Sequence, residues 1–75
     1  GGFALIQGRV ERVDRNRGGV WLELADSLVL RVAPQALHAF DGRQLQGLVG
    51  IFTGVNCHFN RFYIPHGYLI LTFTD

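Results

Sequence analysis

The residues of this sequence best suited to chemistry are seven arginines and a single tryptophan, Trp21. Lysine is absent, and four of the arginines (Arg9, Arg12, Arg15 and Arg17) fall within one nine-residue stretch. Arginine meets phosphate through a planar fork of N–H donors, and nucleic-acid bases stack on aromatic faces. The combination is typical of a nucleic-acid surface, although a formal net charge of +1 is small for one. A solvated, arginine-rich strand edge would give the same cluster.

The acidic residues do not form a pattern typical of a catalytic centre. Hydrolysis of a phosphodiester needs carboxylates that hold a metal ion, or a positioned base beside a phosphate-binding arginine. Asp26 and Asp41 are expected in a turn and at a helix cap. Glu11 and Glu23 are expected to point outward beside arginines, where they would balance charge. Ser27, the only serine, lacks the strand-to-helix elbow of a serine hydrolase. The sequence therefore predicts a protein that is not an enzyme.

A zinc site would have to use Cys57, His58 and His66. Neighbouring residues of a strand point to opposite faces, so Cys57 and His58 are not expected to converge on one ion. A tetrahedral site needs three or four converging ligands. We therefore expect no metal and no cofactor. Cys57 is the only cysteine, so the fold cannot depend on an internal disulfide.

The length and composition favour one folded domain over residues 1–75. The chain is 48% hydrophobic and 17% charged, which is too apolar for a disordered segment. No apolar run approaches the ~20 residues of a membrane-spanning helix. No basic and then apolar leader is visible at the start of the sequence. We expect no membrane partner.

Alternating hydrophobicity predicts three strands in the first half of the chain. The first covers 3–14, where a β-bulge between Glu11 and Arg12 would turn both Val10 and Val13 inward. The second and third strands cover 20–24 and 28–32, and are separated by a turn. Their alternation places four residues on one outer face: Trp21, Glu23, Val29 and Arg31.

The second half is expected to contain one short helix and two further strands. Asp41 resembles an N-cap, with Gln44 three residues later as in a capping box. The short helix that follows would carry Leu45, Leu48 and Val49 on one side, and Gly50 would close it. A helical turn over 35–40 would precede it. A fourth strand is predicted over 51–59. A fifth lies within 61–73 and is interrupted at 65–67, because Pro65 has no N–H for a ladder.

The predicted order is three strands, one helix and two strands. An all-β fold with one short helix in this position is typical of the five-stranded OB barrel. The main alternative is an SH3-like barrel, in which a short 3₁₀ turn replaces the capped helix. We therefore predict a single OB-type domain.

Four segments of the sequence resemble the small OB-like domain of bacterial thermonuclease-like proteins. They are residues 8–13 (GRVERV), 19–24 (GVWLEL), 28–33 (LVLRVA) and 45–50 (LQGLVG). The resemblance implies an accessory, nucleic-acid-facing domain of a nuclease-type protein. Residues 51–55 depart from the family, which has a basic strand there.

The outer face of the second and third strands is the expected binding surface. OB-folds bind single strands across this face, between the loops that join strands one to two and four to five. The candidate nucleic-acid-binding residues are Arg9, Arg12, Arg15, Arg17, Trp21, Arg31, Phe59 and Arg61. A protein partner or a second copy of the chain could use the same aromatic face, because tryptophan is also a common interface anchor.

Overall fold

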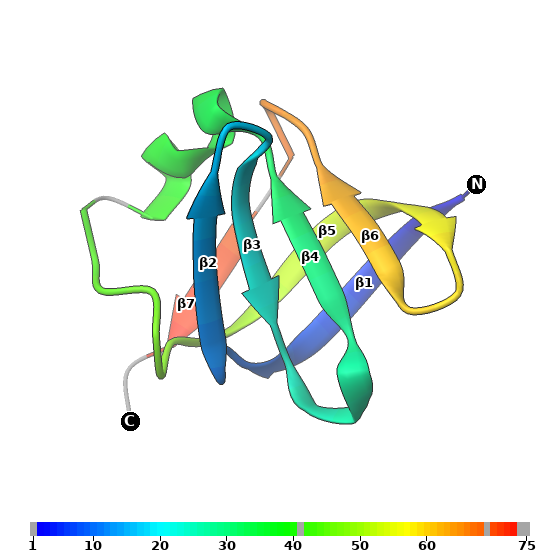
Figure 1. Cartoon of the computed structure of the whole chain (residues 1–75), viewed down its shortest axis with the longest axis horizontal. Coiled ribbons are helices and arrows are strands. Elements are labelled where there is room, and N and C mark those ends of the chain that lie inside the picture. Colours follow the sequence, from blue (N-terminus) through cyan, green and yellow to red (C-terminus); the bar gives the residue numbers. More distant parts are fainter. Residues whose placement is uncertain (1, 41, 69, 74–75) are drawn as a thin grey trace.

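The computed structural model describes residues 2–40, 42–68 and 70–73 and is dominated by β-strands (Figure 1). The strands are β1 (Phe3–Arg9), β2 (Arg12–Asn16), β3 (Gly19–Glu23), β4 (Val29–Val32), β5 (Val49–His58), β6 (Arg61–Ile64) and β7 (Ile70–Phe73). The two helical segments are η1 (Ala25–Ser27), a single turn, and η2 (Pro34–Phe40). The predicted mostly-β class with one short helix is therefore correct.

The strands form one sheet in the order β1-β5-β6-β4-β3-β2, and β7 pairs with β5 beside this path. Neighbouring strands are antiparallel except β4 and β6, which are parallel. The two ends of the path, β1 and β2, are consecutive in the chain. Among the described residues no ladder joins them, so the sheet curls back toward its start without closing.

The chain changes its hydrogen-bonding partner at Val10 and Glu11. The Val10 N–H donates to the Leu48 carbonyl at 2.8 Å, and the Glu11 N–H donates to the Glu23 carbonyl at 2.8 Å. The break in the first strand therefore lies one residue before the predicted bulge, and it divides the strand into β1 and β2. Both valines point inward, as the predicted bulge required: Val10 is fully buried and Val13 packs against the core.

The inner faces of the strands meet in one hydrophobic core. The most completely buried large side chains are Phe52, Leu22, Leu30, Ile64, Val10 and Val32. In β3 and β4 the predicted alternation is correct, because Leu22, Leu30 and Val32 are inward while Trp21 and Arg31 are not buried. Antiparallel pairing of these consecutive strands sets their register, with Leu22 opposite Leu30.

The predicted helix between Asp41 and Gly50 is wrong. The helical segment is η2, which begins at Pro34 and buries Ala36 and Phe40. Residues 42–48 form a loop instead, and the predicted cap Asp41 lies outside the described residues. Gly50 does not end a helix but lies in β5. Within the described chain no helix has the length and hydropathy needed to cross a membrane.

Long-range contacts explain why the loop over 42–48 is not helical. Its Gly47 N–H donates to the carbonyl of Val10 at 2.8 Å, 37 positions earlier in the sequence. Leu45 and Leu48 are both buried from this loop conformation. Their three-residue spacing suggested one face of a helix. Instead, each leucine is buried in the core from a non-helical loop.

The last part of the chain follows the prediction of an interrupted strand. β6 and β7 both pair antiparallel with β5, and the intervening residues form an excursion that contains Pro65. The Tyr68 N–H donates to the Pro65 carbonyl at 3.3 Å and closes a turn there. The fourth predicted strand is also present, but β5 begins at Val49, two residues earlier than expected.

Gly50 lies where β5 passes very close to β7. A Cβ atom at this position would lie 2.6 Å from the carbonyl oxygen of Leu71. Because a backbone atom cannot move as a flexible side chain can, we expect Gly50→Ala to lower the free energy of unfolding by about 1–3 kcal/mol. Chemical denaturation followed by circular dichroism measures this loss.

Gly2→Ala is the matched control, since a Cβ at Gly2 has no atom within 4 Å. It should leave the denaturation midpoint unchanged. An unchanged midpoint for Gly50→Ala would contradict the close approach of β5 and β7.

Candidate functional site

A lateral row of residues crosses the outer face of the sheet. Register pairs join Asp14 to Trp21, Trp21 to Arg31, Arg31 to Tyr63 and Tyr63 to Val55. Directly opposed residues point to the same face of a sheet, so their side chains lie side by side. The row therefore brings together residues from five strands that are up to 49 positions apart in the sequence.

Arg31 lies at the centre of this row, between two aromatic rings. Its Cζ atom is 5.6 Å from the centroid of the Trp21 ring and 5.2 Å from that of the Tyr63 ring. Both distances are within the range of cation–π attraction. The Arg31 Nε also donates to the Gly18 carbonyl at 2.9 Å. These three contacts hold the guanidinium in one orientation.

The tryptophan is also held in place, by the turn between β2 and β3. Its Nε1 donates to Asn16 Oδ1 at 2.9 Å, and the same oxygen accepts the Gly18 N–H at 2.8 Å. One asparagine side chain thus shapes the turn and orients the indole. Trp21 is half-buried, so part of its ring remains in contact with solvent.

A shallow groove of about 370 Å³ covers this part of the sheet. Its lining residues are Trp21, Val29, Arg31, Cys57, Arg61, Phe62 and Tyr63. Its volume is at the lower end of the range of small-molecule sites, ~300–1,000 Å³. The groove combines aromatic rings with two arginines and contains no acidic residue in its lining. It can therefore accept a flat, apolar or anionic group. We call it the Trp21 groove.

Of the predicted site residues, Trp21, Arg31 and Arg61 meet in the Trp21 groove. Arg17 lies beside it, in the turn between β2 and β3. Phe59 lies in the turn between β5 and β6, where it is 83% exposed and its ring meets His58 edge-on at 4.8 Å between centroids. The two loops expected to flank the binding face therefore carry exposed side chains.

Three other predicted arginines do not line this groove. Arg12 is on the outer face of β2 and forms an exposed ion pair with Asp14 at 3.3 Å. Arg15 lines a separate depression beside Leu37 and Phe40, at the end of the sheet covered by η2. Arg9 lies at the far end of β1 and its guanidinium donates to the Gly47 carbonyl at 3.5 Å. The cluster in the sequence is therefore dispersed over the surface.

Sequence reasoning missed Tyr63, which supplies the second aromatic ring of the groove. The sequence did contain a signal for it: Tyr63 is two positions after the candidate residue Arg61, and residues two apart in a strand share a face. Its position beside Arg31 depends on the parallel pairing of β4 with β6. That pairing cannot be read from local alternation.

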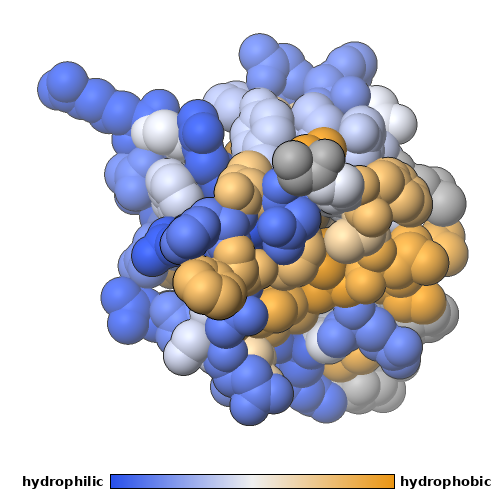
Figure 2. Space-filling view, turned by 90° about the vertical axis from the view of Figure 1, so that its right-hand side faces the viewer, coloured by the Kyte–Doolittle hydropathy of each residue, from blue (hydrophilic) through white to orange (hydrophobic). Residues whose placement is uncertain are grey.

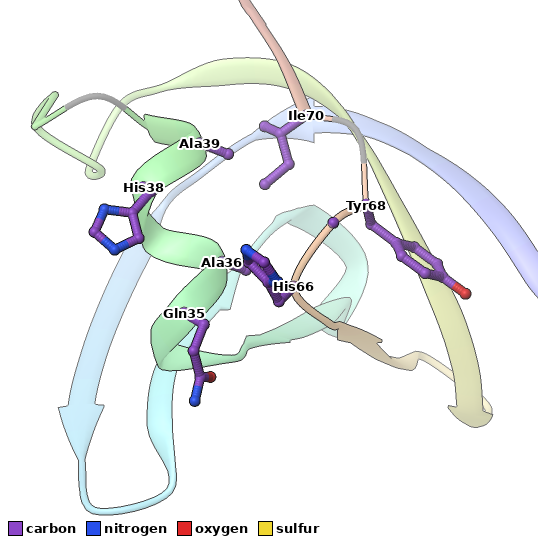
Figure 3. Close-up of a pocket in the computed structure, with 8 residues that line it drawn as sticks. Gln35, Ala36, His38, Ala39, His66, Tyr68 and Ile70 are labelled. Carbon is purple, nitrogen blue, oxygen red and sulfur yellow. The ribbon is translucent and has the colours of Figure 1, made fainter.

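The possible metal ligands do not converge in the structure. Cys57 lines the Trp21 groove, while His66 lines a different depression of about 440 Å³ between η2 and the excursion before β7. Figure 3 shows this depression, which His66 lines together with Ala36 of η2 and Tyr68. The residues that the structure describes contain no group of three or more histidine, cysteine or acidic side chains positioned to hold a metal ion.

Comparison with known proteins gives no further guide to function. No family model matches the chain, and no curated protein or solved structure gives a match. The geometry and chemistry of the Trp21 groove are therefore the basis on which function is inferred.

Proposed function

We propose that this chain is a non-catalytic binding module that contacts single-stranded nucleic acid through the Trp21 groove. The observation that carries the proposal is the arrangement of Arg31 between Trp21 and Tyr63, with Arg61 in the same groove. Bases stack on aromatic faces with little preference for sequence, and arginine neighbours attract the phosphates. The groove offers both kinds of contact on adjacent strands.

The strand order supports an OB-type barrel as the finer description of the fold. β1 and β2 correspond to one bent first strand, which pairs with β5 through one half and with β3 through the other. η2 lies between the third and fourth strands of this scheme, β4 and β5. OB-folds bind oligonucleotides across strands two and three, which here are β3 and β4. These are the strands that carry Trp21 and Arg31.

The resemblance to thermonuclease-like proteins adds the biological setting to this proposal. It favours an accessory domain that helps a nuclease-type protein or a larger assembly to hold its substrate. The described carboxylates do not gather in the groove, which favours binding without hydrolysis. With two arginines in the groove and one beside it, about three phosphate contacts are available, so weak and moderately salt-dependent binding is expected.

The first test is the effect of Trp21→Ala on the binding of a fluorescently labelled single-stranded DNA oligonucleotide. Loss of one stacking partner should weaken binding by roughly 1–3 kcal/mol, measured by fluorescence anisotropy. Because Trp21 is half-buried, the variant should remain folded. In the unchanged protein the same oligonucleotide should quench the fluorescence of Trp21, which is the only tryptophan.

Trp21→Phe is the matched control for this experiment. It keeps an aromatic face but loses the hydrogen bond to Asn16, so most of the affinity should remain. Unfolding of Trp21→Ala by several kcal/mol would show that the residue belongs to the core. A folded Trp21→Ala variant with unchanged affinity would refute the groove as the binding site and favour a protein partner on this face.

The second test compares two arginines of equal charge but different position. Arg31→Ala should weaken oligonucleotide binding and flatten its dependence on salt concentration, because one phosphate contact is lost. Arg15→Ala removes the same charge outside the groove and should change affinity much less. Dissociation constants measured across a series of salt concentrations distinguish these outcomes. Equal effects of both substitutions would indicate a non-specific response to net charge.

A further inference from the structure

Among the residues that the structure describes, one edge of β1 has no strand beside it. Within the described ranges β1 pairs only with β5. Two hydrogen bonds of 2.8 Å lie at the ends of this ladder, one from the Asn56 N–H to the Gly2 carbonyl and one from the Val10 N–H to the Leu48 carbonyl. Residues in an antiparallel ladder alternate between those that bond to the partner and those that do not. The backbone N–H and C=O groups of Phe3, Leu5 and Gln7 therefore point away from β5.

No backbone hydrogen bond reaches these three residues from elsewhere in the described chain. An open strand edge is a template for pairing with another strand. Natural proteins block such edges with lysine, proline, bulges or inward charges. β1 has none of these over 3–8, where it contains no charged residue and no proline.

The side chains along this edge are also unusually apolar. Phe3 and Leu5 are 67% and 69% exposed, and Leu71 on β7 is 48% exposed. Ile51 and Val55 of β5 are half-buried on the same outer face. Figure 2 shows hydrophobic residues gathered over the right-hand part of the side it presents. A hydrophobic surface next to an open edge is typical of an interaction site.

We propose that two copies of this chain associate by antiparallel pairing of their β1 strands, about a two-fold axis at Leu5. This register sets Leu5 opposite Leu5 of the second copy, and Phe3 opposite its Gln7. The outward backbone groups of all three residues would then be satisfied by about six hydrogen bonds. The two sheets would join into one, with the apolar outer faces continuous across the axis.

Two features make a second copy the fitting partner. First, like charges opposite one another destabilise paired strands, and the paired residues 3–7 carry no charge. Second, the same register sets Gly2 of the second copy opposite Gly8. A cavity of about 310 Å³ lies beside Gly8, lined also by Gln7, Leu24 and Ala25, so the incoming chain has room there.

The symmetry limits this association to a dimer, because a two-fold contact uses the open β1 edge of both copies. The contact is also short. It involves five residues of each copy and therefore buries less than the ~1,200–2,000 Å² of a stable complex. We expect a weak, concentration-dependent dimer, with a dissociation constant on the order of 100 µM.

The test combines sedimentation velocity with amide hydrogen exchange by NMR, from about 10 µM to about 1 mM protein, a range that brackets the expected dissociation constant. The mass should rise toward that of a dimer. Over the same range the Leu5 and Gln7 amides should exchange several-fold more slowly. The Ile6 amide points toward β5 and should change little. A monomer at every concentration would overturn the proposal, and so would a dimer in which the Leu5 and Gln7 amides are not slowed.

Leu5→Lys places two positive charges across the axis and should abolish the dimer. Phe59→Lys is the matched control, because it adds the same charge at an exposed apolar residue in the turn between β5 and β6, outside the paired strand. It should leave the dimer intact. Both sites are more than two-thirds exposed, so both variants should keep the unfolding midpoint of the unchanged protein. Dimerisation that survives Leu5→Lys, or that is lost equally in Phe59→Lys, would contradict pairing through β1.

Discussion

The architecture depends on the change of hydrogen-bonding partner at Val10 and Glu11. Two successive N–H groups donate in different directions, one to the Leu48 carbonyl before β5 and the other to the Glu23 carbonyl at the end of β3. A single extended strand therefore serves both ends of the sheet, which makes the sheet curl and enclose one core. Val10 has no exposed surface, so this bend between β1 and β2, which we call the corner, is fixed by packing as well as by hydrogen bonds.

The same corner determines which surfaces remain available. Because β2 turns away to pair with β3, the outer edge of β1 is left without a neighbouring strand in the described part of the chain. The curl also brings β6 beside β4, with which it pairs in parallel. That pair sets Tyr63 next to Arg31 and completes the Trp21 groove. The groove and the open edge are thus two consequences of one backbone feature.

Local alternation was sufficient to predict β3 and β4 and the outward direction of Trp21, because both strands have one buried and one exposed face. It was not sufficient for the loop over 42–48. Leu45 and Leu48 have helical spacing, but a hydrogen bond from Gly47 to distant Val10 decides the conformation. The dispersal of the arginines, in contrast, follows from local alternation. Arg12 and Arg15 are three positions apart in β2, so their side chains lie on opposite faces.

The outer row of the sheet connects the two proposed surfaces. It continues beyond Tyr63 to Val55 on β5 and then to Phe3 on β1, through successive register pairs. A β1-paired dimer would therefore place two Trp21 grooves on one continuous sheet face. With a strand spacing of ~4.8 Å, the two copies of β4 would be at most about 34 Å apart along the sheet.

A single groove offers few charges, and a net charge of +1 gives little long-range attraction. Two grooves on one strand of nucleic acid would gain affinity through effective concentration rather than through new contacts. Weak self-association and weak binding would then reinforce each other, since occupancy of both grooves stabilises the dimer.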